Sequence, residues 1–184
     1  MEIELAARDD VADLARLLWL HAAPHEQAMQ TIDSFATDLG EWWSEHDRSH
    51  VAFVARRTAA GVVGMAWLAL VPRVPRPGRT GRCSGDIQSV FVLPEERGKG
   101  LGAGLIAAAS TYALGLGAGR VVVQSGRRAV PLYERLGFAS SPQLLQTPAQ
   151  VVPCPRLVTA RVAACIIRLW NPRDWPGLDQ PCWE

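Results

Sequence analysis

The chain has 184 residues, of which 48% are hydrophobic and 20% are charged, and its formal net charge is +1. This length suits one domain with a sizeable core, and the near-neutral charge excludes a global basic field for nucleic acid or membrane surfaces. No apolar run reaches the ~20 residues of a membrane-spanning helix. The N-terminal MEIELAARDD carries acids where a signal peptide is basic, so we expect a cytoplasmic protein.

The N-terminal part of the chain predicts strands and helices through its hydrophobic periodicity. In order, these are a strand over 3–8, helices over 9–22 and 32–46, and a hairpin of strands over 50–57 and 62–71. Asp9 or Asp10 is the expected cap of the first helix, and Asp33 or Ser34 that of the second.

The segment 72–82 holds three prolines, two glycines and four arginines without an acid, so we expect it to be irregular. The elements expected after it are a strand over 86–94, a helix over 102–116, a strand over 120–125, a helix ending at Gly137, and a strand beginning at Phe138. Strands separated by helices indicate an α/β or α+β sheet with helices packed on it.

The composition changes after residue 140, where prolines and cysteines concentrate. We expect one domain over 1–140 and an atypical C-terminal extension over 141–184, a final strand and a terminal arm that belong to the same globule. None of the four cysteines has C-x-x-C or zinc-ligand spacing, which favours reduced structural thiols, and no H-E-x-x-H is present. We therefore predict no metal.

Four glycines lie where a strand gives way to a helix: Gly98, Gly100, Gly102 and Gly104. The first N–H groups of a helix are unpaired and carry the positive end of its dipole, so a phosphate binds there where no Cβ intervenes. The first three glycines therefore predict a pyrophosphate cradle, with a structural turn as the alternative. Gly104 is expected to allow close packing of helix on sheet. A Walker A loop is excluded because Lys99 precedes a glycine.

The stretch VFVLPEERGKGLGAGLI resembles the acetyl-CoA-binding segment of the GNAT N-acetyltransferase superfamily. Arg97, Gly100 and Gly102 match its R/Q-x-x-G-x-G/A signature. The later stretch AVPLYERLGF is similar to the family's A-x-x-x-Y-x-[KR]-x-G-F, in the right order. The resemblance covers residues 3–140 and implies the GNAT fold, a mixed and mostly antiparallel sheet of six to seven strands flanked by about four helices.

The resemblance implies an enzyme that moves an acetyl group from acetyl-CoA to a primary amine by direct transfer in a ternary complex. No cysteine lies in the matched segments, in keeping with the absence of a covalent acyl-enzyme. The expected partner is a small-molecule or peptide amine rather than nucleic acid or membrane. Dimers are common in the family, so a homodimer is an open option. The alternatives are a non-catalytic acyl-CoA-binding or sensor module and an enzyme that uses a longer acyl-CoA.

The residues implied in coenzyme A binding are Val90, Phe91, Val92, Arg97, Gly98, Lys99, Gly100, Leu101, Gly102, Ala103, Ser125 and Arg128. The amides of 97–102 would bind the pyrophosphate, and the backbone of Val90 and Val92 would face a gap that takes the pantetheine arm. The family often has asparagine where this chain has Gly126, so Ser125 is a substitute. Arg127 and Arg128 could approach the 3′-phosphate of coenzyme A; the alternative is that both are solvated.

Tyr133 is implied as the general acid for the leaving thiolate, with packing beneath the coenzyme arm as the alternative. Asp86 is the candidate base. The alternative is that Asp86 is a solvated acid paired with Arg82, and Glu95 and Glu96 are weaker candidates for the base. By the strand period of two, Asp86 is expected to share a face with Val90 and Val92. The amide of either valine is the candidate donor to the oxyanion.

The resemblance places the acceptor site on the first two helices and the loop 72–82. The residues that it implies for acceptor binding are Trp42, Trp43, His46 and Arg82, with two further histidines, His21 and His25. Tandem tryptophans suit an aromatic or cationic acceptor, although core anchoring is the alternative for at least one of them. The arginines of the loop are expected to face a carboxylate-bearing acceptor, the coenzyme phosphates or bulk water.

Overall fold

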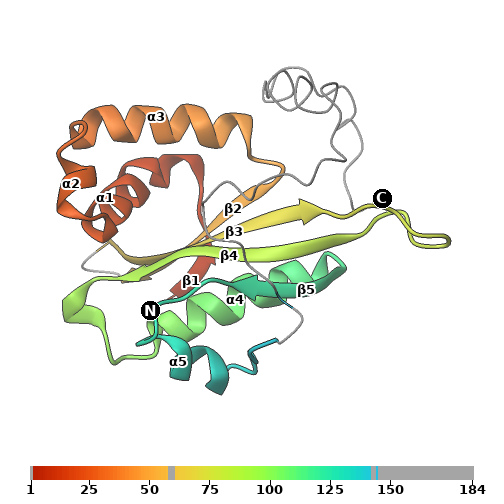
Figure 1. The fold of residues 1–184 in the computed structure, drawn as a ribbon. Coiled ribbons are helices and arrows are strands. Elements are labelled where there is room, and N and C mark those ends of the chain that lie inside the picture. Colours follow the sequence, from red (N-terminus) through yellow and green to blue (C-terminus); the bar gives the residue numbers. More distant parts are fainter. Residues whose placement is uncertain (1, 58–60, 142–143, 145–184) are drawn as a thin grey trace, which may run out of the picture. The chain divides into compact units, whose positions relative to one another are not determined.

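A computed structural model describes residues 2–57, 61–141 and 144 of the chain. These residues form one five-stranded sheet of order β1-β2-β3-β4-β5, antiparallel except for the parallel pair of β4 and β5 (Figure 1). The strands are β1 (Glu2–Leu5), β2 (His50–Arg57), β3 (Gly61–Pro72), β4 (Cys83–Val92) and β5 (Ala118–Val123). The helices are α1 (Val11–His21), α2 (Pro24–Gln27), α3 (Ile32–Glu45), α4 (Leu101–Gly115) and α5 (Val130–Arg135), with 3₁₀ turns at Arg8–Asp10 and Pro94–Glu96.

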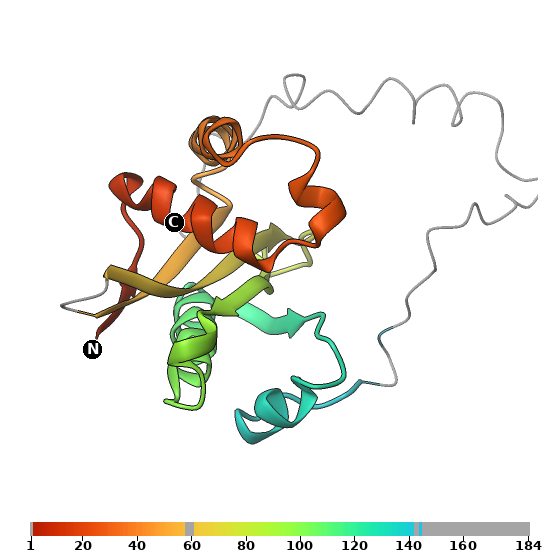
Figure 2. The same cartoon turned by 90° about the vertical axis from the view of Figure 1, so that its left-hand side faces the viewer.

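Helices cover both faces of the sheet. Figure 2 shows α1 and α3 on one face and α4 and α5 on the other. Leu14, Leu17 and Trp43 build the core of the first layer against β2 and β3. Leu105 and Ile106 of α4 build the second. The central strand β3 is buried on both sides from residue 62 to residue 70, which explains its continuous apolar sequence.

The predicted fold class, a mixed and mostly antiparallel sheet with helices packed on it, is confirmed. The described residues contain five strands rather than six or seven. Phe138 does not begin a strand within them, and the C-terminal extension lies almost wholly outside them. Within the part of the chain that the structure describes, no helix is long and apolar enough to cross a membrane.

Several predicted boundaries were wrong for local reasons. Thr31, not Asp33 or Ser34, caps α3, because its hydroxyl accepts the Ser34 N–H at 3.3 Å. β4 begins at Cys83, three residues before the predicted start at 86, and β3 extends to Pro72, so the irregular segment spans 73–82, with an Arg76–Arg79 bridge at the hairpin tip. The four-residue helix α2 was not predicted, because one helical turn leaves no periodicity to detect.

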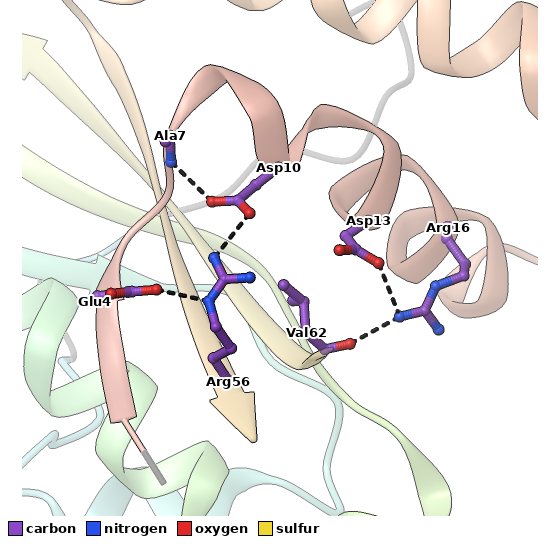
Figure 3. Close-up of polar contacts among 7 residues, drawn as sticks. All are labelled: Glu4, Ala7, Asp10, Asp13, Arg16, Arg56 and Val62. Atoms are coloured by element: carbon purple, nitrogen blue, oxygen red, sulfur yellow. Dashed lines mark hydrogen bonds and ion pairs between the residues drawn. The ribbon is translucent and has the colours of Figure 1, made fainter. Parts of the chain in front are cut away.

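Asp10 is the N-cap residue of α1, but its carboxylate makes no capping hydrogen bond to that helix; it accepts from Ala7 at the 3₁₀ turn and joins the first strand pair to α1 (Figure 3). It accepts the Ala7 N–H at 2.9 Å and an Arg56 guanidinium N–H at 2.8 Å, while Arg56 also pairs with Glu4 at 2.8 Å. Burial alone would raise the pKa of Asp10, but the hydrogen bonds from Arg56 and Ala7 outweigh it and lower that pKa. Arg16 of α1 adds a bond to the Val62 carbonyl at 2.7 Å.

Replacing Asp10 by alanine should lower the free energy of unfolding at pH 7 by about 2 kcal/mol, because Arg56 and the Ala7 N–H lose a buried acceptor. The native pKa lies below the ordinary 3.8, so this stabilisation is complete above that pH and is lost as the pH falls through the native pKa. Urea unfolding at pH 7 and pH 3 measures both effects. Asp13→Ala removes only an exposed pair with Arg16 and is the control; equal losses in the two variants would contradict the prediction.

Candidate active site

The two parallel strands of the sheet separate halfway along. β4 and β5 pair only from Cys83 with Ala118 to Ile87 with Val123, after which β4 continues beside β3 alone. The Leu93 N–H donates to the Val63 carbonyl at 2.9 Å, so by alternation the N–H and C=O groups of Val90 and Val92 point away from β3. Beyond Ile87, β4 therefore presents a backbone edge that β5 does not pair, and an extended ligand can add to it.

A β-bulge lies in β4 at the point where the strands separate. Ala66 faces Val90 and Leu68 faces Ile87, so Trp67 alone opposes two residues, Gln88 and Ser89. The extra residue reverses the alternation of side chains beyond it. Bulges of this kind are frequent beside active sites because they redirect side chains.

The expectation that Asp86 shares a face with Val90 and Val92 was therefore wrong. Val90 and Val92 pack against the α4 layer together with Ile87, so Asp86 faces the α1 and α3 side. Phe91 also turns to that side: its ring packs in the α1 core, 5.3 Å from the His21 ring, and its backbone pairs with β3. Phe91 is thus not placed to bind a ligand at the open edge, whereas Val90 and Val92 are.

The loop between β4 and α4 presents a run of unpaired N–H groups. Among the described residues, the six main-chain N–H groups from Gly98 to Ala103 have no protein acceptor, and the first helical bond runs from Gly104 to the Gly100 carbonyl at 3.0 Å. Arg97 does not contribute its N–H, which donates to the Pro94 carbonyl at 3.3 Å. The run of unpaired N–H groups thus lies at 98–103 rather than at the predicted 97–102, and its chemistry suits an anion.

The glycines of this loop have three different roles. Gly98 and Gly100 have φ of 76° and 82°, which a side chain resists, while no atom lies within 4 Å of an added Cβ. A Cβ on Gly102 would meet Leu132 of α5 in ordinary contact at 3.7 Å. A Cβ on Gly104 would overlap the Ile3 side chain of β1, so the expected close packing of α4 on the sheet is confirmed.

Glu96 holds the loop through two cations. Its buried carboxylate accepts from Arg57 of β2 at 2.6 Å and from Lys99 at 3.0 Å. The hydrogen bond from Lys99 lowers the pKa of Glu96 most, burial opposes it, and Arg57 lowers it further. Glu96 is therefore a poor base, and the Lys99 ammonium is committed to it.

Tyr133 is positioned by the way α5 ends. The Phe138 N–H bonds to the Tyr133 carbonyl at 3.0 Å and the Gly137 N–H to the Glu134 carbonyl at 3.0 Å, with Gly137 at φ 87°, which is a Schellman motif. The rings of Tyr133 and Phe138 pack at 5.4 Å. The spacing Y-x-x-x-G-F is thus one helix end whose cap fixes the tyrosine. Tyr133 is buried, and this burial raises the pKa of its phenol.

Two other predicted ligand residues lie just after β5. Ser125 is half-buried and Arg128 is exposed, as is Gly126, which has no atom within 4 Å of an added Cβ.

Arg97 lies beside the open edge of β4. Its Nε donates to the Val92 carbonyl at 3.0 Å, and its guanidinium carbon lies 5.6 Å from the centre of the Phe91 ring.

A pocket of about 580 Å³ opens on the α1 and α3 face and reaches the bulge; we call it the helical pocket. It is lined by Leu18, Trp19, His21, Ala22, Glu26, Gln27, Met29, Gln30, Phe35 and Ser89. Of the histidines and tryptophans expected at an acceptor site, only His21 is among them. Trp19, Phe35 and Ser89 were missed, and no signal in the sequence marks the bulge that turns Ser89 into the pocket.

The other predicted acceptor residues lie elsewhere. Trp43 is only 5% exposed and its indole N–H donates to the His50 carbonyl at 2.9 Å, so it anchors α3 in the core. Trp42 is 37% exposed and stacks on His46 at 4.8 Å. Asp86 lies across Ala69 from His50 in the sheet register. Burial lowers the pKa of His50, His46 lowers it further, and Asp86 opposes both.

Arg82 does not pair with Asp86. Its Nη1 donates to the Val74 carbonyl at 2.6 Å, and its side chain lines a second hollow of about 540 Å³ at the base of the β3–β4 hairpin. We call this hollow the arginine pocket; it is lined by Arg73, Arg76, Arg79, Gly81, Arg82, Cys83, Ser84, Gly117, Gly119 and Arg120. The open edge of β4, the cradle and the helical pocket lie toward the other end of the strand.

A curated relative, the glucosamine 6-phosphate N-acetyltransferase of Trypanosoma brucei brucei, is 38% identical over 77 residues, which are 42% of this chain and 50% of that protein. The chain therefore spans about half the length of the curated relative that it matches.

Solved structures share the fold. An acetyltransferase of Trypanosoma brucei is 26% identical with a TM-score of 0.64, over 80% of this chain and 98% of its own. A predicted acetyltransferase of Clostridium acetobutylicum, crystallised with acetyl-CoA, is 16% identical with a TM-score of 0.62, over 80% and 95%. The glucosamine-6-phosphate N-acetyltransferase of Arabidopsis thaliana is 17% identical with a TM-score of 0.64, over 81% and 98%. The sequence matches the Acetyltransferase (GNAT) family over residues 11–138, and the chain belongs to that family.

Proposed function

We propose that this protein transfers an acetyl group from acetyl-CoA to a primary amine, directly and within a ternary complex. The observation that supports it most is the open edge of β4 leading straight into six unpaired N–H groups. A diphosphate satisfies the N–H groups at Gly98–Ala103, and the amides of a pantetheine arm pair with Val90 and Val92. Acetyl-CoA, once seated, supplies the thioester carbonyl that an amine attacks.

The chain offers a donor and an acid for such a transfer. The N–H of Val90 or Val92 is the donor to the carbonyl oxygen as that oxygen gains charge. Tyr133 is the acid: its buried phenol has a raised pKa and therefore keeps its proton at neutral pH until a thiolate takes it.

Asp86 is the proposed base, and it lies on the face of β4 opposite to Val90 and Val92. The bulge places Asp86 on the side of the sheet that α1 and α3 cover, where the helical pocket opens, so an ammonium that enters there can lose its proton toward Asp86 through water. His50 of β2 lies across β3 from Asp86. Its lowered pKa keeps the imidazole neutral and able to accept a proton.

The helical pocket is the proposed acceptor site, and its lining favours an amine with an apolar or aromatic body. The rings of Trp19 and Phe35 lie 6.1 Å apart in its wall, and Met29 is largely exposed. The lining holds one carboxylate, Glu26, fixed by the Ala23 N–H at 2.7 Å, and no lysine or arginine. Glu26 attracts an ammonium group, whereas an acceptor with a phosphate finds no cation there.

Glucosamine 6-phosphate is the second candidate acceptor, because the curated relative is named for it. Its phosphate would need the arginine pocket, yet Ser84 of that pocket and Ser89 of the helical pocket are five residues apart on β4. That separation is about 17 Å along a strand, which is longer than a phosphorylated monosaccharide.

Gly100→Leu should weaken the binding of coenzyme A at least about 100-fold, because a side chain at positive φ distorts the run of N–H groups. Isothermal titration calorimetry with coenzyme A measures the effect. Gly78→Leu is the matched control, since Gly78 has φ 73° and equally open surroundings on the distant hairpin. Wild-type affinity in Gly100→Leu would overturn the cradle.

Tyr133→Phe should lower kcat about 100-fold and leave the affinity for coenzyme A within about twofold, because only the proton donor is removed. Steady-state kinetics with thiol release as the readout, over pH 6–10, measures both. Tyr112→Phe is the control, since the other tyrosine packs edge-on against Phe53 in the core. A Tyr133→Phe enzyme with normal kcat would remove Tyr133 from the acid role.

A panel of amines should show a kcat/KM at least about tenfold higher for an arylalkylamine such as phenethylamine than for glucosamine 6-phosphate. Glu26→Gln should raise KM for the amine without changing the affinity for coenzyme A. A preference for the phosphorylated sugar would move the acceptor site out of the helical pocket. Coenzyme A binding without turnover of any amine, or faster turnover with longer acyl-CoA donors, would favour the two alternative functions.

A further inference from the structure

The arginine pocket gathers five cations around one hollow. Arg73, Arg76, Arg79 and Arg82 come from the β3–β4 hairpin and Arg120 from the start of β5. No carboxylate is among the lining residues of this pocket, and none of the ion pairs of the described residues involves these five side chains. Partial burial lowers the pKa of Arg82, and Arg76, Arg73 and Arg79 add to that effect. Their mutual repulsion is relieved by an anion.

The hairpin holds the backbone that carries four of these side chains in a defined geometry. Arg76 and Arg79 exchange two backbone hydrogen bonds of 3.0 and 2.8 Å across a turn with Gly78 at φ 73°. The Arg73 N–H donates to the Arg82 carbonyl at 2.7 Å, and the Arg82 guanidinium donates to the Val74 carbonyl. The cations are thus carried by a closed hairpin rather than an irregular loop, which reduces the ordering that a ligand must impose.

The pocket lies away from the site of acyl transfer. Figure 1 shows the β3–β4 hairpin extending from the end of the sheet opposite the loop that leads into α4. Ser84, in the arginine pocket, and Val90, on the open edge, are six residues apart, or about 20 Å along the strand. This separation favours neither the coenzyme phosphates nor a small acceptor in the helical pocket as the partner of these arginines.

We propose that the arginine pocket binds a small polyphosphate anion at a site separate from that of acyl transfer. Guanidinium groups bind phosphate oxygens in pairs with fixed geometry, which favours phosphate over an isolated carboxylate. The volume of about 540 Å³ is that of a small-molecule site. The lining contains no aromatic ring on which a base stacks, so the phosphates themselves are recognised and a nucleoside adds nothing.

Calorimetric titration of the full chain with inorganic tripolyphosphate tests the proposal. Binding is expected in the micromolar range at low salt, weaker as ionic strength rises. The double variant Arg76→Gln/Arg79→Gln should weaken it at least about tenfold while coenzyme A still binds normally. These two positions are exposed and their turn is held by backbone bonds, so the fold is preserved. Arg8→Gln, which removes one exposed arginine that does not line the pocket, is the control and should bind as the wild type does.

Two further arms separate the possible sources of the signal. ATP should bind about as tightly as tripolyphosphate, and the tricarboxylate citrate at least about tenfold more weakly. The Gly100→Leu variant should retain tripolyphosphate binding, because the anion does not occupy the cradle. The proposal is overturned if tripolyphosphate does not bind, or if Arg8→Gln weakens its binding as much as the double variant does. It is also overturned if ATP binds tenfold more tightly than tripolyphosphate, if citrate binds as tightly as tripolyphosphate, or if Gly100→Leu abolishes tripolyphosphate binding. None of these outcomes depends on whether acyl transfer occurs.

Discussion

The separation of β4 from β5 at Ile87 is the constraint on which the rest of the site depends. A strand that loses its partner leaves N–H and C=O groups that must be satisfied by water or a ligand. In this chain, Arg97 satisfies only the Val92 carbonyl. The unpaired edge leads to the start of α4, where six more N–H groups lack an acceptor among the described residues. A single extended ligand with amides at one end and a diphosphate at the other satisfies both deficits.

One additional residue in β4 puts the residues of the proposed acetyl-CoA site and those of the proposed acceptor site on opposite faces of the sheet. Without the bulge at Gln88–Ser89, Asp86 and Val90 would face the same helix. With it, Val90 and Val92 belong to the α4 layer while Asp86 and Ser89 belong to the side that α1 and α3 cover. The proposed acid on α5 and the proposed base on β4 therefore lie on opposite sides of the sheet, which keeps proton removal from an amine apart from proton delivery to a thiolate.

Features made by local hydrogen bonds could be predicted from sequence. The glycines at 98 and 100, and the end of α5 with Gly137, are fixed by backbone conformation within a few residues. Features that depend on pairing or packing of distant segments could not. The bulge arises from the register of β4 against β3, and Trp43 is buried because Trp67 of β3 meets it edge-on at 5.2 Å. Tandem tryptophans have the same pattern whether one or both are exposed.

The chain presents positive charge to anions in two chemically different ways. At the cradle, Arg57 and Lys99 face the single carboxylate of Glu96, so one positive charge remains beside the positive end of α4. Neutral N–H groups there make the contacts and glycines set their direction, which suits one ligand held in one orientation. In the arginine pocket, flexible guanidinium groups supply both charge and contacts. A site of this kind would select a ligand by charge and by the geometry of its phosphates rather than by overall shape, unlike a site that aligns a reaction.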